Sequence, residues 1–373
     1  KKFNLMQILP SLRSGGVEQG TLDVANYLSS LDTQNYICSN GGNMLSNLNK
    51  KYTRHFELPV HSKNFLMMPF IAKKINRIVK DMDINILHFR SRAPSWLLPY
   101  INKYNLKTVS TFHNVYGNQN ILKKIYNRQL GKVDKIVAIS NYVKGEIIYN
   151  YNLNEKKITV INRGIDTDYF DNDLIDTKNL STFIKKFDIK INKKIILYPG
   201  RLSGWKGQIE FLEVIEYFKD QPIIFYFVGD DKNQSYLASL KKKINDKNLN
   251  VNCKILGHLD REHLKLMYSC CNLVISAPLK PEGFGRTISE TLSMKKMILA
   301  YNIGGVQDQL KLLDKIYKVK NQDTNEMISK IKIALELNDN NILNLGNIAR
   351  KHVMDNFSKN NMLKSYLNFY KEL

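Results

Sequence analysis

The sequence predicts an α/β protein of two Rossmann-like domains that face each other across a cleft. Its 373 residues exceed the length of one ordinary domain and suffice for two, each with its own core. Short apolar runs alternate with segments of helical periodicity, which is typical of a parallel sheet covered by helices on both faces. The alternation stops in a polar interval and then starts again, as expected of two doubly wound units.

The first domain is expected over residues 1–165. Helices are predicted at 21–31 and 70–80, where apolar residues recur near one face. Gln7 interrupts the apolar run that follows Lys1 and Lys2, and the run is too short for the core of a signal peptide, so we interpret it as a strand. The predicted strands are Phe3–Leu9, Ile84–Phe89, Thr108–Phe112, Lys135–Ile139 and Ile158–Ile161.

The interval 166–192 is polar and is the predicted linker, and residues 193–352 are expected to form the second domain. Residues 353–373 should end in a helix with Ser358 as its N-cap, which can return to the first domain. Because ligands bind outside the carboxyl ends of parallel strands, we expect the site in the cleft. The predicted strands of the second domain are Lys194–Pro199, Ile223–Val228, Asn252–Leu256, Leu273–Ser276 and Met297–Tyr301.

The composition excludes several classes of protein. With 43% hydrophobic and 24% charged residues and no apolar run of bilayer length, a transmembrane protein is not expected. A formal net charge of +22 favours anionic partners, but no nucleic-acid-binding motif accompanies it, so we expect no nucleic acid. Two explanations of this positive charge are left open: attraction to a membrane surface, and lysines that are merely solvated. Four cysteines without Cys-x-x-Cys spacing are interpreted as reduced thiols of a cytoplasmic protein: Cys38, Cys253, Cys270 and Cys271.

Two glycines lie in the loop between the first strand and the first helix. Gly15 and Gly16 let backbone approach a ligand, and the helix start offers unpaired N–H groups to a phosphate. Taken alone, the pair is equally well explained as a tight turn.

Two cations follow the first strand of the second domain. Arg201 and Lys206 lie between Gly200 and Gly207 and could converge on a diphosphate. Considered by themselves, they are also explained as exposed loop cations.

The segment 281–290 reads Pro-Glu-Gly-Phe-Gly-Arg-Thr-Ile-Ser-Glu and follows a buried strand. Its glycines should expose backbone N–H groups where a helix begins. The carboxylates of Glu282 and Glu290 can each accept from a pair of adjacent hydroxyls, one on a sugar and one on a ribose.

This segment resembles the motif of two glutamates separated by seven residues in glycosyltransferase family 4, within the GT-B fold. Other elements similar to those of the family follow in its order along nearly the whole chain: Gly15–Val17, Gly200–Gly207, Phe227–Asp230, Leu256–Gly257 and Gly304–Val306.

The resemblance implies a retaining, metal-independent glycosyltransferase without a resident cofactor. Its donor would be a UDP-sugar or GDP-sugar, and the hexose would go to a hydroxyl of a glycan or lipid-linked acceptor. Arg201 and Lys206 would neutralise the diphosphate and stabilise the leaving group. Glu282 would face the transferred sugar and Glu290 would bind the ribose. The implied donor-binding backbone comprises Gly15, Gly16, Gly200, Gly257, Gly283, Phe284 and Gly285.

His113 ends a strand of the first domain and matches a histidine that the family places near the reacting sugar. The leaving phosphate can itself act as the base in retaining enzymes of this fold, so a general-base role is not assigned to His113. The chain departs from the family at Asp308, where a glutamate is frequent, and at Trp205, where a smaller or polar residue is common. Weaker candidates, expected to meet an anionic acceptor or to line the cleft, or else to lie in solvent, are His88, Arg90, Arg92, Ser140 and Lys144.

Two basic segments of the first domain either lie in a lipid headgroup interface or pack their apolar side into the core. The first, residues 64–80, carries Phe65, Leu66, Met67, Met68 and Phe70 beside Lys73, Lys74, Arg77 and Lys80, and the second carries Lys123, Lys124, Arg128 and Lys132. The expected setting is lipopolysaccharide, capsule or glycolipid assembly at the inner face of the cytoplasmic membrane. The alternatives are a nucleotide-sugar epimerase or sucrose-type synthase of the same fold, and a catalytically silent sugar-nucleotide-binding protein.

Overall fold

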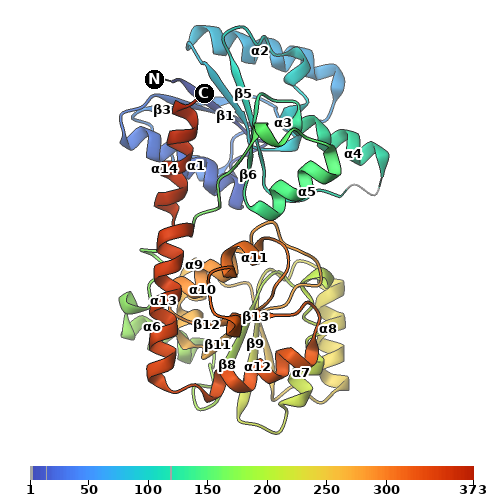
Figure 1. Cartoon of the computed structure of the whole chain (residues 1–373), viewed down its shortest axis with the longest axis vertical. Coiled ribbons are helices and arrows are strands. Elements are labelled where there is room, and N and C mark those ends of the chain that lie inside the picture. The colour runs from blue at the N-terminus through green and yellow to red at the C-terminus, as the bar shows by residue number, and fades with distance from the viewer. Residues whose placement is uncertain (1–2, 14, 118–119) are drawn as a thin grey trace. The chain divides into compact units, whose positions relative to one another are not determined.

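The computed structural model describes residues 3–13, 15–117 and 120–373 (Figure 1). Lys1 and Lys2, which precede the first predicted strand, and Ser14 of the glycine loop lie outside the described residues. The chain divides into two compact units, residues 1–163 with 360–373, and residues 164–359. Each unit is a parallel sheet with helices packed against it, which confirms the predicted α/β class of two Rossmann-like domains.

The described part of the first unit forms a seven-stranded sheet in the order β3-β2-β1-β4-β5-β6-β7. The strand order reverses between β1 and β4, which pair in parallel with Ile8 opposite Phe89. All five predicted strands are present, whereas β2 and β3 were not predicted. The strands are β1 (Leu5–Ile8), β2 (Asn35–Ser39), β3 (Thr53–Glu57), β4 (Ile86–Phe89), β5 (Lys107–Phe112), β6 (Lys135–Ala138) and β7 (Ile158–Val160).

Helices of the first unit begin at residues suited to that position. Asn120 caps α4 by accepting from the Leu122 N–H at 2.8 Å, and Ser140 caps α5 by accepting from the Val143 N–H at 3.0 Å. Gly15 is the N-cap of α1, with φ of 130°, a conformation that favours glycine. The helices are α1 (Gly16–Ser30), α2 (Met68–Asp81), α3 (Arg92–Ser95), α4 (Ile121–Arg128) and α5 (Asn141–Tyr151).

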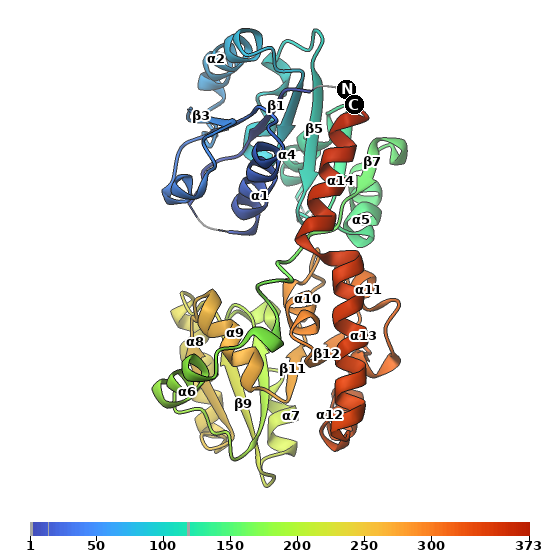
Figure 2. The same cartoon turned by 90° about the vertical axis from the view of Figure 1, so that its left-hand side faces the viewer.

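The C-terminal helix α14 (Lys359–Lys371) completes the core of the first unit (Figure 2). Its apolar face, Met362, Leu363, Tyr366, Phe369 and Tyr370, packs in one cluster with side chains of β1, α1 and β4–β6. The ring of Tyr370 lies 5.7 Å from that of Phe3. Residues at the two ends of the chain therefore share one core.

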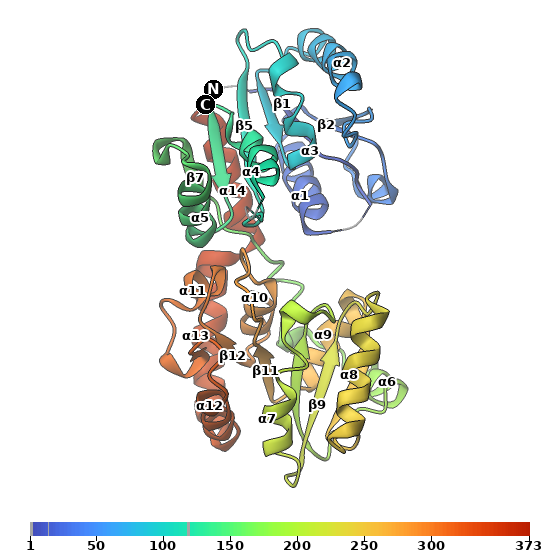
Figure 3. The same cartoon turned by 90° about the vertical axis from the view of Figure 1, so that its right-hand side faces the viewer.

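The second unit, all of whose residues are described, forms a six-stranded sheet in the order β10-β9-β8-β11-β12-β13 (Figure 3). Its order reverses between β8 and β11. The five predicted strands are present, and the two-residue β13 was not predicted. The strands are β8 (Lys194–Pro199), β9 (Ile223–Val228), β10 (Cys253–Gly257), β11 (Leu273–Ser276), β12 (Met297–Tyr301) and β13 (Lys318–Val319).

The interval 166–192, predicted as a linker, holds helix α6 and belongs to the second unit. Helix α13 ends at Phe357, with Ser358 as its C-cap, directly before α14. The helices of this unit are α6 (Thr177–Lys186), α7 (Leu212–Tyr217), α8 (Gln234–Asp246), α9 (Arg261–Cys270), α10 (Arg286–Ser293), α11 (Gly305–Leu310), α12 (Thr324–Glu336) and α13 (Asp339–Phe357).

Candidate active site

Lys206 and Glu282, which are 76 positions apart in the sequence, form an ion pair at the carboxyl edge of the second sheet. Their side chains are 13% and 16% exposed, so the pair is largely shielded from water. The Trp205 ring lies 4.7 Å from the Lys206 ammonium, which gives the unusual tryptophan a role in covering that cation. Arg201 differs from Lys206, because it is exposed and has no carboxylate of a described residue within 4 Å.

The chain segments at the ends of β8, β9 and β10 pass close to one another beside Arg201, and glycines make this close approach possible. A Cβ on Gly229 would lie 2.0 Å from the Gly200 carbonyl oxygen, a distance that no side chain tolerates. The N–H of Gly229 in turn donates to the Gly257 carbonyl at 2.8 Å, and Gly257 has φ of 71°. Gly200 and Gly257 are therefore required by the backbone path at this edge.

The second glycine pair holds the loop that carries Glu282. The N–H of Gly305 donates to the Glu282 carbonyl at 2.8 Å. A Cβ on Gly304 would lie 2.7 Å from that same oxygen, and one on Gly305 would lie 2.3 Å from the Gly283 carbonyl oxygen. Any larger residue at either position would push the loop away. Asp308, where the family often has glutamate, lies in the first turn of α11 directly after this pair.

Gln309 fixes the backbone of the Gly-Phe-Gly segment. Its amide nitrogen donates to the carbonyls of Phe284 and Gly285, and its oxygen accepts from the Ser289 hydroxyl. Phe284 is 3% exposed and packs edge-on against Phe357. With both carbonyls engaged, the N–H groups of Phe284 and Gly285 donate to no other described residue, so they remain available at the start of α10.

Glu290 lies within α10 and is 7% exposed. The Tyr268 hydroxyl donates to one carboxylate oxygen at 3.2 Å, and the Arg286 guanidinium lies 3.0 Å from the other. Burial raises the pKa of Glu290, and the Arg286 charge opposes that shift. Tyr268 was not identified from the sequence, because nothing in its apolar surroundings distinguishes it from a core tyrosine.

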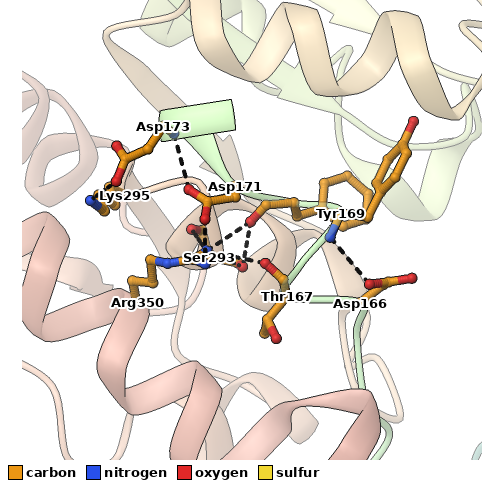
Figure 4. A network of polar contacts seen from close by, with 9 residues as sticks. Asp166, Thr167, Tyr169, Asp171, Asp173, Ser293, Lys295 and Arg350 are labelled. Atoms are coloured by element: carbon orange, nitrogen blue, oxygen red, sulfur yellow. Dashed lines mark hydrogen bonds and ion pairs between the residues drawn. The ribbon is translucent and has the colours of Figure 1, made fainter. Parts of the chain in front are cut away.

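Arg350 anchors the carboxyl end of α10 (Figure 4). Its Nη1 donates to the carbonyl of Ser293, the last residue of α10, at 2.7 Å and to that of Phe170 at 3.0 Å. Its Nη2 pairs with Asp171 at 2.7 Å, and the two side chains are 12% and 16% exposed. The Ser293 hydroxyl donates to Phe170 at 2.6 Å. The segment 167–171 is thereby tied to α10 and α13 within the second unit.

In the first unit, Arg163 joins two residues that the sequence singled out. Its Nη1 donates to the Gly16 carbonyl at 2.7 Å, and its Nη2 contacts Nδ1 of His113 at 2.9 Å. A Cβ on Gly16 would lie 2.8 Å from Nη1, so the glycine leaves room for the guanidinium. Arg163 was missed, although its position after β7 and before a glycine could have marked it.

The tautomer of His113 follows from its neighbour. A guanidinium only donates, so Nδ1 must accept and the proton of the neutral ring is on Nε2. Burial, followed by the charges of Arg163 and Arg90, holds the pKa of His113 well below its usual range. The ring is therefore neutral at neutral pH, and its buried Nε2–H lies near the Arg90 backbone carbonyl without forming a hydrogen bond of regular geometry.

Most weaker candidates have structural contacts. His88 is fully buried between the Tyr370 hydroxyl and the Thr111 hydroxyl, each at 2.7 Å, so the hypothesis that it meets an acceptor or solvent is wrong. Arg92 lies 4.0 Å from the Tyr116 ring centroid and donates to an asparagine. Ser140 caps α5, and Lys144 pairs with an exposed glutamate at 2.8 Å.

The chain is similar to known proteins along nearly its whole length. Family models for Glycosyltransferase Family 4 and for Glycosyl transferases group 1 match residues 14–169 and 181–352. A crystal structure of a glycosyltransferase from Rickettsia africae is 36% identical, with a TM-score of 0.90 over 100% of this chain and 98% of that chain. The chain belongs to glycosyltransferase family 4. The predicted family is thereby confirmed.

The GT-B fold of this family 4 glycosyltransferase is shared with Anabaena HepE, solved in complex with UDP and glucose. The two superpose with a TM-score of 0.81 over 100% of both chains at 16% identity. Trehalose synthase of Thermococcus litoralis is 23% identical over 225 residues, 58% of this chain and 53% of that protein. The chain thus spans about half the length of the curated relatives it matches.

In residues 3–13, 15–117 and 120–373, no three His, Cys, Asp or Glu side chains gather as metal ligands would. None of the helices in the described part of the chain combines the length and apolarity needed to cross a bilayer.

Proposed function

We propose that this glycosyltransferase is a retaining hexosyltransferase that uses a UDP- or GDP-sugar and requires no metal. The observation that carries the proposal is the Lys206–Glu282 pair beside exposed Arg201 and the available N–H groups of Phe284 and Gly285. Two cations and the start of a helix give this edge of the sheet a positive potential suited to a diphosphate.

In the proposed reaction, Lys206 and Arg201 hold the donor diphosphate. The Lys206 ammonium has three donors, so it can keep its contact with Glu282 while it binds a phosphate oxygen. As the bond between the anomeric carbon and the phosphate oxygen breaks, negative charge grows on the leaving nucleotide. The two cations stabilise that charge without rearrangement, because Lys206 is already oriented by Glu282.

The carboxylates are assigned to hydroxyl recognition. Glu282 accepts from hydroxyls of the transferred hexose, and Glu290 accepts from the ribose. The acceptor hydroxyl attacks the anomeric carbon from the face that the nucleotide leaves, and its proton passes to the leaving phosphate. This route retains the anomeric configuration and requires no protein base.

The groups of the first unit have a recognition role in this proposal. The neutral Nε2–H of His113 is a donor for a sugar hydroxyl, and the amino end of α1 at Gly15 and Gly16 suits a phosphate. Because the pKa of His113 is low, we assign it hydrogen bonding and not proton transfer as an acid.

We further propose that the acceptor is a glycan or lipid-linked glycan of lipopolysaccharide, capsule or glycolipid assembly, and that the chain works at an anionic membrane surface. Support comes from a patch of exposed apolar side chains on the segment 65–70 and on α4. The rings of Phe65, Trp96 and Tyr126 link the two parts, with centroids 5.1 Å and 5.5 Å apart. The patch comprises Phe65, Leu66, Met67, Phe70, Ile121, Leu122 and Ile125, with exposed Lys73, Lys74, Lys123 and Lys124 nearby in the sequence.

Apolar side chains beside lysines are the composition of an interfacial surface. Vesicle sedimentation tests the patch. We expect binding to vesicles that contain phosphatidylglycerol, weaker binding to phosphatidylcholine alone, and loss of binding in the Leu66→Ser, Phe70→Ser variant. Equal sedimentation of that variant and the wild type would contradict the membrane assignment.

Turnover of a donor panel tests the proposed reaction. The purified chain is incubated with UDP- and GDP-sugars, with and without EDTA and with lipid-linked glycans, and release of the nucleotide is measured. We expect release with one donor, unchanged by EDTA and at least about tenfold slower in Arg201→Gln. The control is Lys242→Gln, an exposed lysine of α8. Nucleotide binding without turnover on any donor would instead support a silent binding protein, and a product still linked to nucleotide would indicate an epimerase.

A further inference from the structure

Arg90 occupies the position in the first unit where ligands of open parallel sheets bind. It follows β4 directly, and its N–H donates to the Ile8 carbonyl at the end of β1, at 2.8 Å. The strand order reverses between these two strands, and ligands bind outside their carboxyl ends at such a reversal. The residue is only 2% exposed.

The guanidinium of Arg90 lacks the partners that a buried cation needs. Its Nε and Nη1 are buried and donate to no group in the described part of the chain, where no carboxylate lies within 4 Å either. The Tyr370 hydroxyl beside the guanidinium and the Tyr366 ring, 5.1 Å from Cζ, compensate the charge only in part. The guanidinium of arginine stays protonated even when it is buried, so Arg90 keeps its positive charge. A buried charge without acceptors is costly unless a ligand supplies them.

The residues around Arg90 leave space for its guanidinium, and a second positive charge lies nearby. Gly20 of α1 lies against the guanidinium, since a Cβ there would be 3.4 Å from Nη2. Arg90 and Arg163 are both close enough to act electrostatically on the His113 ring. The buried Nε2–H of His113 lies near the backbone carbonyl of Arg90, with which it forms no hydrogen bond of regular geometry. The unused donors of Arg90 thus lie at the end of β4, next to the end of β5 that carries His113.

We propose that the first unit binds a compact oxyanion, a phosphate or carboxylate group, at the guanidinium of Arg90. The inference rests on the proposed function, because Arg201 and Lys206 already account for the donor diphosphate. The oxyanion is therefore a substituent of the acceptor glycan. The substrate class that follows is a phosphorylated or acidic glycan.

Anion binding is tested first by thermal unfolding. Inorganic phosphate and acetate are compared with chloride at equal ionic strength, in an Arg201→Gln, Lys206→Gln background where the donor site no longer contributes. We expect phosphate, acetate or both to raise Tm beyond chloride, and the oxyanion with the larger effect identifies the class. Adding Arg90→Met should weaken its binding at least about tenfold, because a charge-assisted contact is lost. The matched control is Arg77→Met, an arginine of α2 whose side chain is 84% exposed.

Arg90→Met should fold, because an apolar side chain of similar length replaces an unpaired buried charge. Arg90→Lys, which keeps the charge with fewer donors, provides a second variant and should bind the anion with intermediate affinity. An equal effect of the oxyanions in the presence and absence of the Arg90 guanidinium would overturn the proposal, as would the lack of any effect beyond chloride.

Nucleotide affinity separates this site from the donor site. In the otherwise unaltered chain, Arg90→Met should leave the Kd for UDP within about twofold, while Arg201→Gln weakens it at least about tenfold. Equal losses in the two variants would place Arg90 in the donor site and overturn the inference. With acceptor glycans, Arg90→Met should raise KM for acidic acceptors only. If the chain proves catalytically silent, loss of phosphate binding in Arg90→Met would still support the anion site while the proposed reaction fails.

Discussion

Replacing Lys206 with glutamine should weaken UDP binding more than the loss of a single contact explains. A hydrogen bond to a charged group contributes about 1.5–3 kcal/mol. In addition, Glu282, 16% exposed, would lose its partner and face the diphosphate as a like charge. Two unit charges about 8 Å apart at an effective dielectric constant of about 20 repel by about 2 kcal/mol. Together these terms correspond to a loss of roughly a thousandfold in affinity.

A double-mutant cycle measured by isothermal titration of UDP separates the two terms. Adding Glu282→Gln to Lys206→Gln removes the repulsion and should recover about tenfold or more in affinity. Lys242→Gln on α8 controls for the general loss of positive charge. If Glu282→Gln fails to recover affinity in that background, the ion pair does not face the diphosphate and the reasoning is refuted.

Three further changes test the frame around the site. Gly229→Ala places a Cβ 2.0 Å from the Gly200 carbonyl oxygen, so the free energy of unfolding in urea should fall by about 2 kcal/mol or more; an unchanged midpoint would show that the crossing is not close. Arg350→Met leaves Asp171 and several carbonyls without their donor, so the free energy of unfolding in urea should fall by about 3–5 kcal/mol. A fall of less than about 1 kcal/mol would mean that the network is dispensable. The pKa of His113 is lower in the folded state than its unfolded value of about 6.5, so the stability that the neutral ring contributes is present above about pH 6.5 and is lost as the pH falls below that value. Below this pH, Tm should therefore decline less steeply in His113→Gln than in the wild type. Parallel curves of Tm against pH would argue against a buried neutral ring.

The sequence predicted the sheets well where strands are apolar on both faces. β9, with six buried residues, is an example. β3 was missed because it lies at the edge of the first sheet and consists mostly of polar residues, such as Arg54 and His55. β13 was missed because two residues carry no periodicity. In both cases pairing with a neighbour, and not local composition, creates the strand.

The loops of the candidate site could be singled out from the sequence because their glycines are required locally. Gly200 and Gly285 have positive φ, and such positions select glycine whatever lies elsewhere in the chain. The contacts between loops could not be predicted in this way. The partnership of Arg163 with His113, 50 positions away, depends on the order of strands in the sheet.

Buried polar side chains were the least predictable part of the candidate site. Gln309 and Arg350 occur in helices whose sequences give no sign of a special role, yet they fix the ends of α10. Arg90 was expected to meet an acceptor or solvent, and its burial with Nε and Nη1 unpartnered became evident only from the fold. Burial depends on long-range packing, which a single sequence does not reveal.

The most direct test of the central claim is the anomeric configuration of the product. The wild type and Arg201→Gln are incubated with the active nucleotide-sugar and its acceptor, and proton NMR follows the anomeric signals of donor and product. We expect the wild type to form a glycoside with the configuration of the donor, and Arg201→Gln to form it at least about tenfold more slowly. A product of inverted configuration, or equal rates in the two proteins, would contradict a retaining reaction driven by the cations at the carboxyl edge of the second sheet.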